Sequence, residues 1–385
     1  MSTSGTKRVL LIAASIALLC AVFWLKGRTA MADFEVNHEA GGRLLAGETL
    51  YRTADEHWQF KYSPFSALIY LPLSLLPLPA AKAIWFFLVA AAIAAIVLLS
   101  RRILGATGPP TGLAVGLAAA VLARFFLREL QLGQINAVIT VLLLLMVIEL
   151  EKGRKVSSAA ADARAGLLWG CATALKPYAV IFLPYFLLRK RFRPLLTGLG
   201  VVAVSLAVPA LFYGLPGLGT VLREWVATLS RSTPGLFDTQ DNVSLMALFV
   251  KWTGNIPAST ILFGVATGIL ALLTLAAVLK GKALSDPLPL ETSLLLLFIP
   301  LLSPLGWDYT FLSAFPAVLI VFRAWDRFPP IGRIILALNC AVIGLALYDL
   351  LGRKLYAAFM ARSIPTLNFL IIAAALFYLR RRRAA

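Results

Sequence analysis

The sequence predicts an all-α protein that crosses a lipid bilayer many times. Of its 385 residues, 60% are hydrophobic and only 14% are charged, and the mean hydropathy is +0.86. A water-soluble domain of this size needs far more charge on its surface. Apolar runs recur along the whole chain, and most approach the roughly 20 residues that a helix needs to cross the hydrocarbon core. Since unpaired backbone groups are not tolerated in lipid, we expect these runs to be helices.

The apolar runs give the predicted helices in order. They cover residues 9–25, 82–100, 111–127, 134–150, 195–213, 258–279, 288–302, 309–322, 331–350 and 364–379. The first run is long, and Lys26 and Arg28 follow it before the small-residue triplet 30–32. This arrangement predicts a retained signal-anchor and not a cleaved leader. We therefore treat residues 1–385 as a single integral membrane domain.

Basic residues set the orientation of these helices. The net charge is +18, and Lys and Arg gather beside helix ends, at 101–102, 152–155, 189–193, 280–282, 323–327 and 380–383. This is the positive-inside distribution, with anionic membrane lipids as additional partners, and it argues against nucleic-acid binding. Both termini are then cytoplasmic. Residues 26–62 form a long first extracytoplasmic loop, and residues 214–257 form a second extracytoplasmic stretch.

Two segments interrupt the regular pattern of spans. Residues 63–79 contain Pro64, Pro72, Pro77 and Pro79. They are predicted to form a re-entrant or interfacial element, with a kinked span as the alternative. Residues 163–188 are split by Lys176-Pro177, which predicts two short helices that meet on the outer side. The total is about 10–12 transmembrane helices.

The polar side chains outside the basic clusters gather on the outer face. They are Asp33, Glu35, His38, Gln131, Gln134, Asn136, Lys176, Asp241, Asn242 and Asp308. A transport path would instead place its polar groups near the middle of the membrane, in interrupted helices. The one-sided distribution therefore favours a site open to the extracytoplasmic leaflet.

Asp33 and Lys176 are the first candidates for chemistry. A partly desolvated carboxylate at the outer boundary of the membrane has a raised pKa and can act as a general base, although Asp33 also fits an exposed loop acid. Glu35, His38 and Glu39 are equally eligible on spacing. Lys176 lies between two apolar stretches, where a cation needs a phosphate or carboxylate partner or has to snorkel to the interface.

Amide and aromatic residues supply candidate binding groups. Gln131, Gln134 and Asn136 suit sugar hydroxyls, but amides also join membrane helices. Trp307, Asp308 and Tyr309 form either a sugar platform or an interfacial anchor, and Tyr62 and its neighbours form either a site wall or an interfacial belt.

The order of several short motifs resembles glycosyltransferase family 87. The motifs are Asp33-Phe34, Leu44-Leu45-Ala46-Gly47, Leu50-Tyr51, Phe60-Lys61-Tyr62-Ser63-Pro64 with Pro72, Leu132-Gly133-Gln134-Ile135-Asn136, Lys176-Pro177 and Ser303-Pro304-Leu305-Gly306-Trp307. The family consists of GT-C-type membrane enzymes, including polyprenol-phosphate-mannose-dependent mannosyltransferases of phosphatidylinositol mannoside and lipoglycan synthesis. The resemblance covers about residues 30–320.

The resemblance implies a GT-C-type bundle and a mechanism. Asp33 matches the aspartate of the family's first loop and is the expected general base for inverting transfer of a sugar, with mannose first, from a polyprenyl phosphate to an extracytoplasmic glycolipid or glycan. No metal and no other cofactor is implied, since Lys176 or a nearby arginine can stabilise the leaving phosphate. The expected substrate-binding residues are Tyr62, Gln131, Gln134, Asn136, Lys176, Asn242, Trp307, Asp308 and Tyr309.

The resemblance also implies a multi-pass protein of the bacterial plasma (inner) membrane that works in cell-envelope biosynthesis, with an extracytoplasmic active site. One departure concerns the sugar. Many relatives place one or two histidines after the Ser-Pro…Trp element, where this chain has Asp308-Tyr309. The donor or acceptor contacts therefore differ there, or the sugar does. The alternative functions are a transporter or flippase of lipid-linked substrates and a non-enzymatic membrane scaffold.

Overall fold

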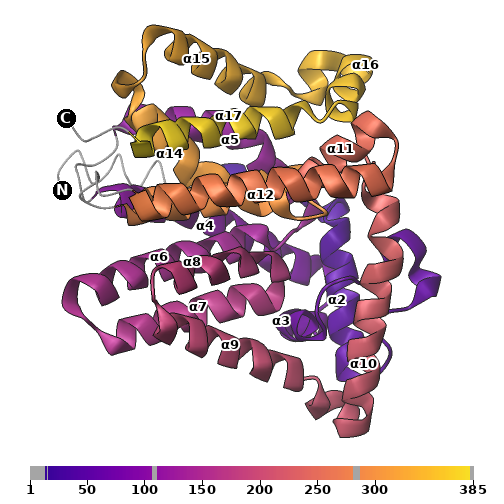
Figure 1. The fold of residues 1–385 in the computed structure, drawn as a ribbon. Helices are drawn as coiled ribbons and strands as arrows, with labels where there is room; N and C mark the ends of the chain where they lie inside the picture. The colour runs from indigo at the N-terminus through magenta and orange to yellow at the C-terminus, as the bar shows by residue number, and fades with distance from the viewer. Residues whose placement is uncertain (1–13, 15, 106–110, 281–286, 382–385) are drawn as a thin grey trace, which may run out of the picture.

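Every element that the computed structural model describes is a helix (Figure 1). The description covers residues 14, 16–105, 111–280 and 287–381, which confirms the all-helical prediction for this part of the chain. Of the predicted first helix, residues 16–25 are helical, whereas its start at residue 9 lies outside the described residues. The same is true of most of the basic cluster at 280–282 and of the end of the cluster at 380–383.

The α-helices have the following bounds. They are α2 (Ala32–Leu45), α3 (Pro64–Ser74), α4 (Leu78–Leu104), α5 (Gly112–Leu132), α6 (Asn136–Val156), α7 (Ala159–Leu175), α8 (Phe182–Leu188), α9 (Phe192–Ala207), α10 (Ala210–Ser232), α11 (Leu245–Thr253), α12 (Ile256–Lys280), α13 (Leu288–Leu302), α14 (Phe315–Arg323), α15 (Pro330–Leu345), α16 (Tyr348–Ala361) and α17 (Ile364–Arg381). The 3₁₀ turns are η1 (Gly27–Thr29), η2 (Thr53–Trp58), η4 (Pro177–Ile181), η5 (Pro234–Leu236), η6 (Asp308–Ala314) and η7 (Trp325–Arg327).

Several helices are suited to a membrane by length and composition. Among the described residues, α4, α12 and α17 qualify singly, and the bent pairs α9–α10 and α15–α16 raise the number to five. The large apolar side chains of α12 face outward, with Ile261 69% and Leu272 66% exposed, which is a surface that water would not support. These features support a membrane protein, and the count of 10–12 spans stays a prediction.

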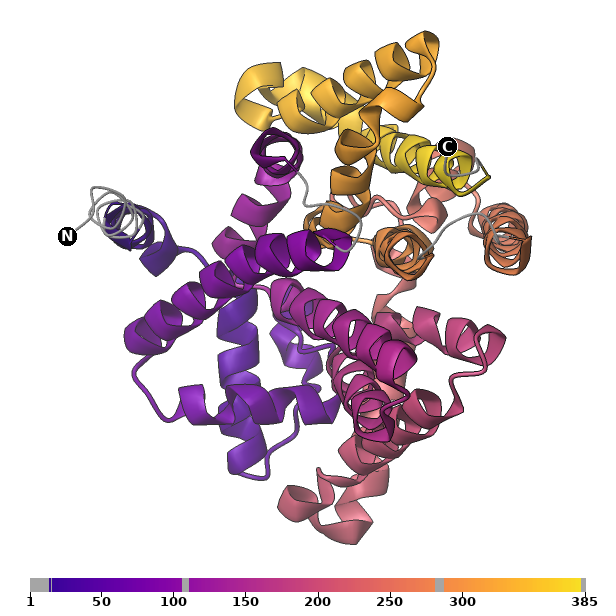
Figure 2. The ribbon, with the colours of Figure 1, turned by 90° about the vertical axis from the view of Figure 1, so that its left-hand side faces the viewer.

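Two sets of helices differ in direction. Several long helices, including α5, α6, α12 and α17, run in similar directions, and Figure 2 shows α12 end-on. α10 and α2 run across the ends of this bundle, upright at the right of Figure 1. The chain turns by 89° between α9 and α10 and by 101° between α15 and α16. The bundle and this outer layer together frame the candidate site.

The helix boundaries correct several predicted loops. Residues 128–132, which lie between the predicted helices 111–127 and 134–150, form the end of α5, and Gly133 caps this helix. The first loop contains α2, and the stretch 214–257 contains most of α10. Because polar and apolar residues are mixed along α10, its sequence forms no continuous apolar run. Residues 309–322 begin as the 3₁₀ turn η6 and become α-helical only at Phe315. The predicted break at Lys176-Pro177 is confirmed.

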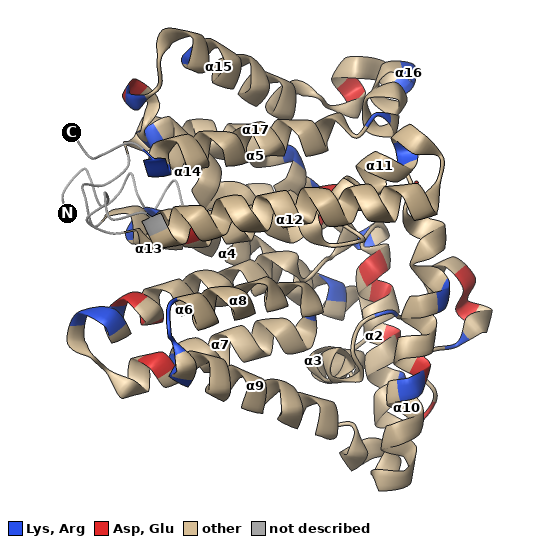
Figure 3. Cartoon of the chain, viewed as in Figure 1, with Lys and Arg blue, Asp and Glu red and all other residues tan. Residues whose placement is uncertain are grey.

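The far end of the bundle carries the basic clusters. Buried Glu291 at the start of α13 pairs with Arg189 and Arg380, at the ends of α8 and α17. Arg323 at the end of α14 donates to the carbonyl of Leu104 at the end of α4. These contacts place four of the predicted basic helix ends together, as the blue segments in Figure 3 show. The polar outer-face residues lie at the opposite end.

Two apolar cores hold the layers in place. The larger one lies within the bundle and includes Trp85, Phe125, Trp169 and Phe311. A smaller core fastens the outer layer and includes Leu44, Tyr51, Phe60, Ala67 and Val221, which come from α2, α3, α10 and the first loop. The first loop is therefore a packed unit that can hold a side chain in a fixed position.

Candidate active site

A cavity of about 710 Å³ opens between the outer layer and the ends of the bundle. Its wall brings together side chains that are far apart in the sequence. The charged and amide groups on the wall include Asp33, Lys61, Arg128, Gln134, Lys176 and Asp241. Trp58, Tyr62, Trp225, Trp307 and Tyr309 supply aromatic surface, and Val180, Ile181, Ile299 and Leu302 form an apolar side. The cavity thus combines a polar centre with a route toward apolar surroundings.

Asp33 is positioned by the contact between α2 and the turn from α5 to α6. The backbone N–H of Met31 donates to the carbonyl of Gln131 at 2.8 Å, which fixes the start of α2. Gly133 has φ +69°, and a Cβ at this residue would lie 2.7 Å from Cβ of Phe34, so no larger residue fits. Asp33 lies in the first turn of α2, where the helix dipole favours a negative charge.

The position of Lys176 follows from the proline after it. Pro177 has no N–H and disfavours a helical conformation at the preceding residue, so α7 ends and Lys176 is extended, with φ −138° and ψ 121°. The carbonyls left without helical partners are satisfied by the start of α3: Ser63 Oγ donates to Ala174 at 2.6 Å, and Ser66 Oγ to Leu175 at 2.7 Å. The Tyr-Ser-Pro and Lys-Pro motifs are therefore one structural unit.

Gln134 connects the carboxylate of Asp33 with the ammonium of Lys176. Its Nε2 donates to Asp33 Oδ2 at 2.7 Å, and its Oε1 accepts from Lys176 Nζ at 3.0 Å and from the Tyr62 hydroxyl at 3.1 Å. Within the described chain, Oδ1 of Asp33 has no hydrogen-bond partner, so it is available to a molecule in the cavity. Asp33 is half-buried, whereas Gln134 and Lys176 are buried.

Burial changes the pKa values of the groups around Asp33. It lowers the pKa of Lys176 to about 8, against the opposing effects of Glu129 and Asp33. Burial also lowers the pKa of Lys61, while the nearby charge of Asp33 opposes this shift. The pKa of the Tyr62 phenol is raised, chiefly by burial and then by Asp33, so this group stays protonated and donates to Gln134.

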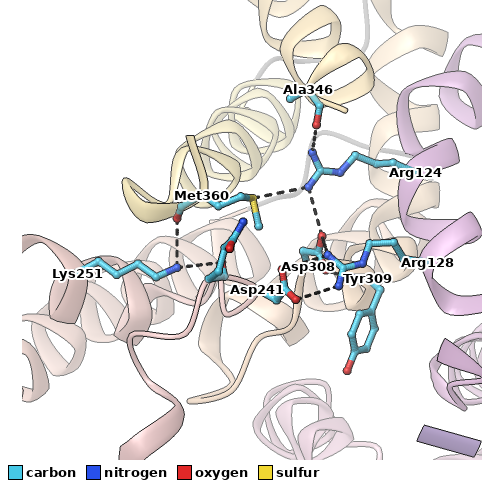
Figure 4. A network of polar contacts seen from close by, with 9 residues as sticks. Arg124, Arg128, Asp241, Lys251, Asp308, Tyr309, Ala346 and Met360 are labelled. Carbon is cyan, nitrogen blue, oxygen red and sulfur yellow. Dashed lines mark hydrogen bonds and ion pairs between the residues drawn. The ribbon is translucent and has the colours of Figure 1, made fainter. Parts of the chain in front are cut away.

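A second ionic network supports the outer end of α5. Arg128 donates to Asp308 at 2.9 Å and to both carboxylate oxygens of Asp241, at 3.0 and 3.2 Å (Figure 4). Arg124 donates to Asp308 at 3.3 Å and to the carbonyl of Ala346 at 2.6 Å. The fully buried Asp308 thus ties η6 to α5, and Arg124 ties α5 to the junction between α15 and α16.

Asn242 shapes the loop that carries Trp307. Its Oδ1 accepts from the N–H groups of Gly306, at 3.1 Å, and Ser244, at 3.2 Å, and its Nδ2 donates to the carbonyl of Pro304 at 3.2 Å. A Cβ on Gly306 would lie 1.9 Å from the carbonyl oxygen of Pro300, which explains the glycine there. The loop therefore presents Trp307 and Tyr309 to the cavity from a fixed backbone.

The structure divides the residues that the sequence singled out. Six of them line the cavity: Asp33, Tyr62, Gln134, Lys176, Trp307 and Tyr309. Asn136, Asn242 and Asp308 are buried behind the wall and hold it in place. The side chain of Gln131 is exposed outside the lining, and only its backbone carbonyl contributes, through Met31. Glu35 pairs with Lys82, and Glu39 pairs with Arg43.

Several residues of the site were not among the predicted ones. Lys61, Arg128 and Trp225 line the cavity, and Glu129 is fully buried behind it. A glutamate next to an arginine at the end of an apolar run is a signal that the sequence does contain. These two residues were interpreted as part of a turn, because the helix was expected to end at residue 127. Trp225 lies on α10, which hydropathy alone does not reveal.

Comparison with known proteins agrees with this geometry. No curated protein matches the sequence. The profile of glycosyltransferase family 87 matches residues 60–304, which is well over half of the chain and includes most elements of the cavity wall. With most of its motifs brought together around one cavity, the chain belongs to glycosyltransferase family 87.

Proposed function

We propose that the protein transfers a hexose, with mannose as the first candidate, from a polyprenyl phosphate to a hydroxyl of an extracytoplasmic glycolipid or glycan. One observation carries the proposal: the half-buried carboxylate of Asp33 faces the cavity with Oδ1 unengaged while Gln134 holds Oδ2. A general base needs this combination of fixed position and an open lone pair. The binding of a metal or another cofactor forms no part of the proposal.

The proposed step is a single in-line displacement. Oδ1 of Asp33 takes the proton of the acceptor hydroxyl as its oxygen forms a bond to the anomeric carbon. The bond between that carbon and the phosphate oxygen breaks, and polyprenyl phosphate leaves with the electron pair, so the anomeric configuration inverts. Lys61 and Arg128 on the wall supply positive charge for the leaving phosphate.

The apolar side of the cavity supports a lipid-linked donor. Val180 and Ile181 come from η4, and Ile299 and Leu302 come from the end of α13. Val180 is 49% exposed, so this side continues onto the outer surface of the bundle. An isoprenoid tail can lie there while its phosphate reaches the charged centre. The aromatic side chains opposite suit sugar rings.

The test is donor turnover by the purified full-length protein in detergent. Polyprenyl-phosphate mannose is the donor, and a total lipid and glycan extract of cell envelopes supplies acceptors. Asp33→Asn is expected to lower turnover by about 10²–10⁴-fold, because the base is lost while the hydrogen bond to Gln134 can persist. Glu39→Gln is the matched control, since Glu39 lies on the same helix but is exposed and outside the cavity lining.

Two outcomes would contradict the proposal. Near-normal turnover by Asp33→Asn would show that Asp33 is not the general base. Movement of the donor across vesicle membranes with no change in its covalent structure would point to a flippase. Mass spectrometry of the products identifies the transferred sugar and the acceptor in the same experiment.

A further inference from the structure

A buried carboxylate that the proposed reaction does not use lies behind the cavity. Glu129 is 0% exposed, close to the end of α5. Its Oε2 accepts from Asn136 Nδ2 at 2.8 Å, and its Oε1 accepts from the backbone N–H of Ala137 at 2.8 Å. It therefore touches neither the cavity nor Asp33. Burial raises the pKa of this carboxyl, and the hydrogen bond from Asn136 and the positive charge of Lys176 oppose the shift.

A continuous series of hydrogen bonds leads from Glu129 to Asp33. Because Asn136 directs its amide nitrogen to Glu129, its Oδ1 faces the other way and accepts from Lys176 Nζ at 2.8 Å. Lys176 Nζ donates in turn to Gln134 Oε1, at 3.0 Å. The amide nitrogen of Gln134 is thereby left for Asp33 Oδ2. Tyr62 and Tyr178 reinforce this direction by donating to Gln134 Oε1 and Asn136 Oδ1, both at 3.1 Å.

The direction of the series depends on the group at its beginning. An ionised carboxylate only accepts hydrogen bonds, and an ammonium only donates them. Between these fixed ends, the two amides have one orientation in which every contact joins a donor to an acceptor. A reversed Gln134 would put its carbonyl oxygen against the carboxylate of Asp33, and the two acceptors would repel each other.

We infer that Glu129 is a positioning residue for the base. Through Asn136 and Lys176 it fixes the orientation of the Gln134 amide, and the amide holds Asp33 with Oδ1 toward the cavity. The inference rests on the proposed role of Asp33 as the base. It assigns Lys176 to the support of Gln134, with the charge toward the leaving phosphate supplied by Lys61 and Arg128.

The pH dependence of turnover reports on this arrangement. The titratable groups that face Lys176 are Glu129 from α5, Asp33 from α2, Tyr62 from the first loop and Tyr178 from η4. Because burial lowers the pKa of Lys176, its ammonium loses its proton at a lower pH than that of an exposed lysine. The series of hydrogen bonds from Glu129 to Asp33 then loses the ammonium of Lys176 as its central donor, and kcat is expected to fall. Removal of the Glu129 charge lowers the pKa of Lys176 further.

The experiment measures kcat and KM for polyprenyl-phosphate mannose from about pH 6 to about pH 10. Glu129→Gln is expected to lower kcat by about 10²-fold with little change in KM, and to move the alkaline fall in kcat to lower pH. Glu129→Asp keeps the charge and is expected to keep the alkaline fall in place with a smaller loss of kcat. The control is Glu291→Gln, which removes an equally buried glutamate at the far end of the bundle.

Each result decides the inference separately from the function. A Glu129→Gln protein with wild-type kcat and pH profile overturns it, as does a loss of activity that only follows the folded fraction and matches that of Glu291→Gln. If Glu129→Gln does not fold, the Glu129→Asp protein decides, because an unchanged kcat there overturns the inference. Asp33→Asn is measured in parallel. Its normal turnover would instead contradict the proposed function itself.

Discussion

The carboxylate of Asp308 is completely buried, and it accepts a hydrogen bond from Arg128 at 2.9 Å. Arg128 borders the cavity, whereas Asp308 lies behind it. Asp308, which was expected to contact substrate, thus supports a residue that lines the cavity. The same relationship, a cavity group held by a buried partner, recurs between Lys176 and Asn136.

Asp308→Leu is expected to destabilise the protein strongly. Arg124, whose side chain is only 6% exposed, would lose its carboxylate partner. Arg128 would lose this partner too and keep its pairing with Asp241. Breaking a buried ion pair from one side costs about 3–5 kcal/mol. Thermal unfolding in detergent should show a large fall in Tm. Asp326→Leu serves as the control, because Asp326 is 97% exposed and its ion pair is 3.9 Å long; equal Tm values for the two variants would disprove the prediction.

Ser66→Ala is expected to loosen the start of α3, and with it the adjoining end of the first loop, from the end of α7. The variant leaves the carbonyl of Leu175 buried without its 2.7 Å hydrogen bond, at a cost of about 1–3 kcal/mol. Tm should fall, and kcat should fall with it, because Tyr62 and Lys176 lie on the two joined segments. Ser74→Ala removes a hydroxyl that bonds only within its own helix, to Leu71, and should leave both quantities unchanged. The same kcat in both variants would argue against the coupling.

Gly133→Ala is expected to impair activity more than stability. The added Cβ would meet Phe34 at 2.7 Å and displace the first turn of α2, which carries Asp33. A displacement of about 1 Å can lower turnover by about 10²-fold. Gly254→Ala is a matched control: its φ of +63° imposes a similar backbone strain, but no atom lies within 4 Å of the new Cβ. Similar turnover in the two variants would exclude a steric effect on Asp33.

Lys61→Met is expected to raise KM for the donor by about tenfold, the effect of about 1.4 kcal/mol of lost binding. In the described part of the chain, Nζ of Lys61 has no hydrogen-bond partner, although the side chain lines the cavity. A phosphate can therefore bind to it without displacing a protein group. Lys61→Arg should retain most of the affinity, and Lys152→Met, remote from the cavity and paired with Glu149, should retain all of it. An unchanged KM in Lys61→Met would place the phosphate elsewhere.

The elements that the sequence revealed are those with a continuous apolar surface. The predicted run 288–302 coincides with α13, and the break before Pro177 follows from the chemistry of proline. Helices that lie across the bundle were missed, because α10 and α16 mix polar and apolar residues and hydropathy detects only uniform runs. Charged side chains near the end of an apolar run, as in α5, also made that helix read as shorter than it is.

The site was predictable in part, for a similar reason. Asp33, Gln134 and Lys176 stand out as polar residues in apolar surroundings, and they do meet at one cavity. The sequence could not show which polar residues face the cavity and which lie behind it. Only tertiary contacts bury Asn242 and Asp308 behind the wall and leave Trp307 on its surface. Glu129 was indistinguishable from an exposed loop acid until α5 was seen to continue past it.

The docking of Ser63 and Ser66 onto the carbonyls of Ala174 and Leu175 has a consequence for evolution and for engineering. These two segments are about a hundred residues apart in the sequence and share one set of hydrogen bonds. A substitution that moves one segment alone would leave the buried carbonyl oxygens without hydrogen-bond donors. Substitutions in the two should covary among homologues. A chimera that exchanges the first loop between relatives will retain its architecture only when the Lys-Pro junction is exchanged with it.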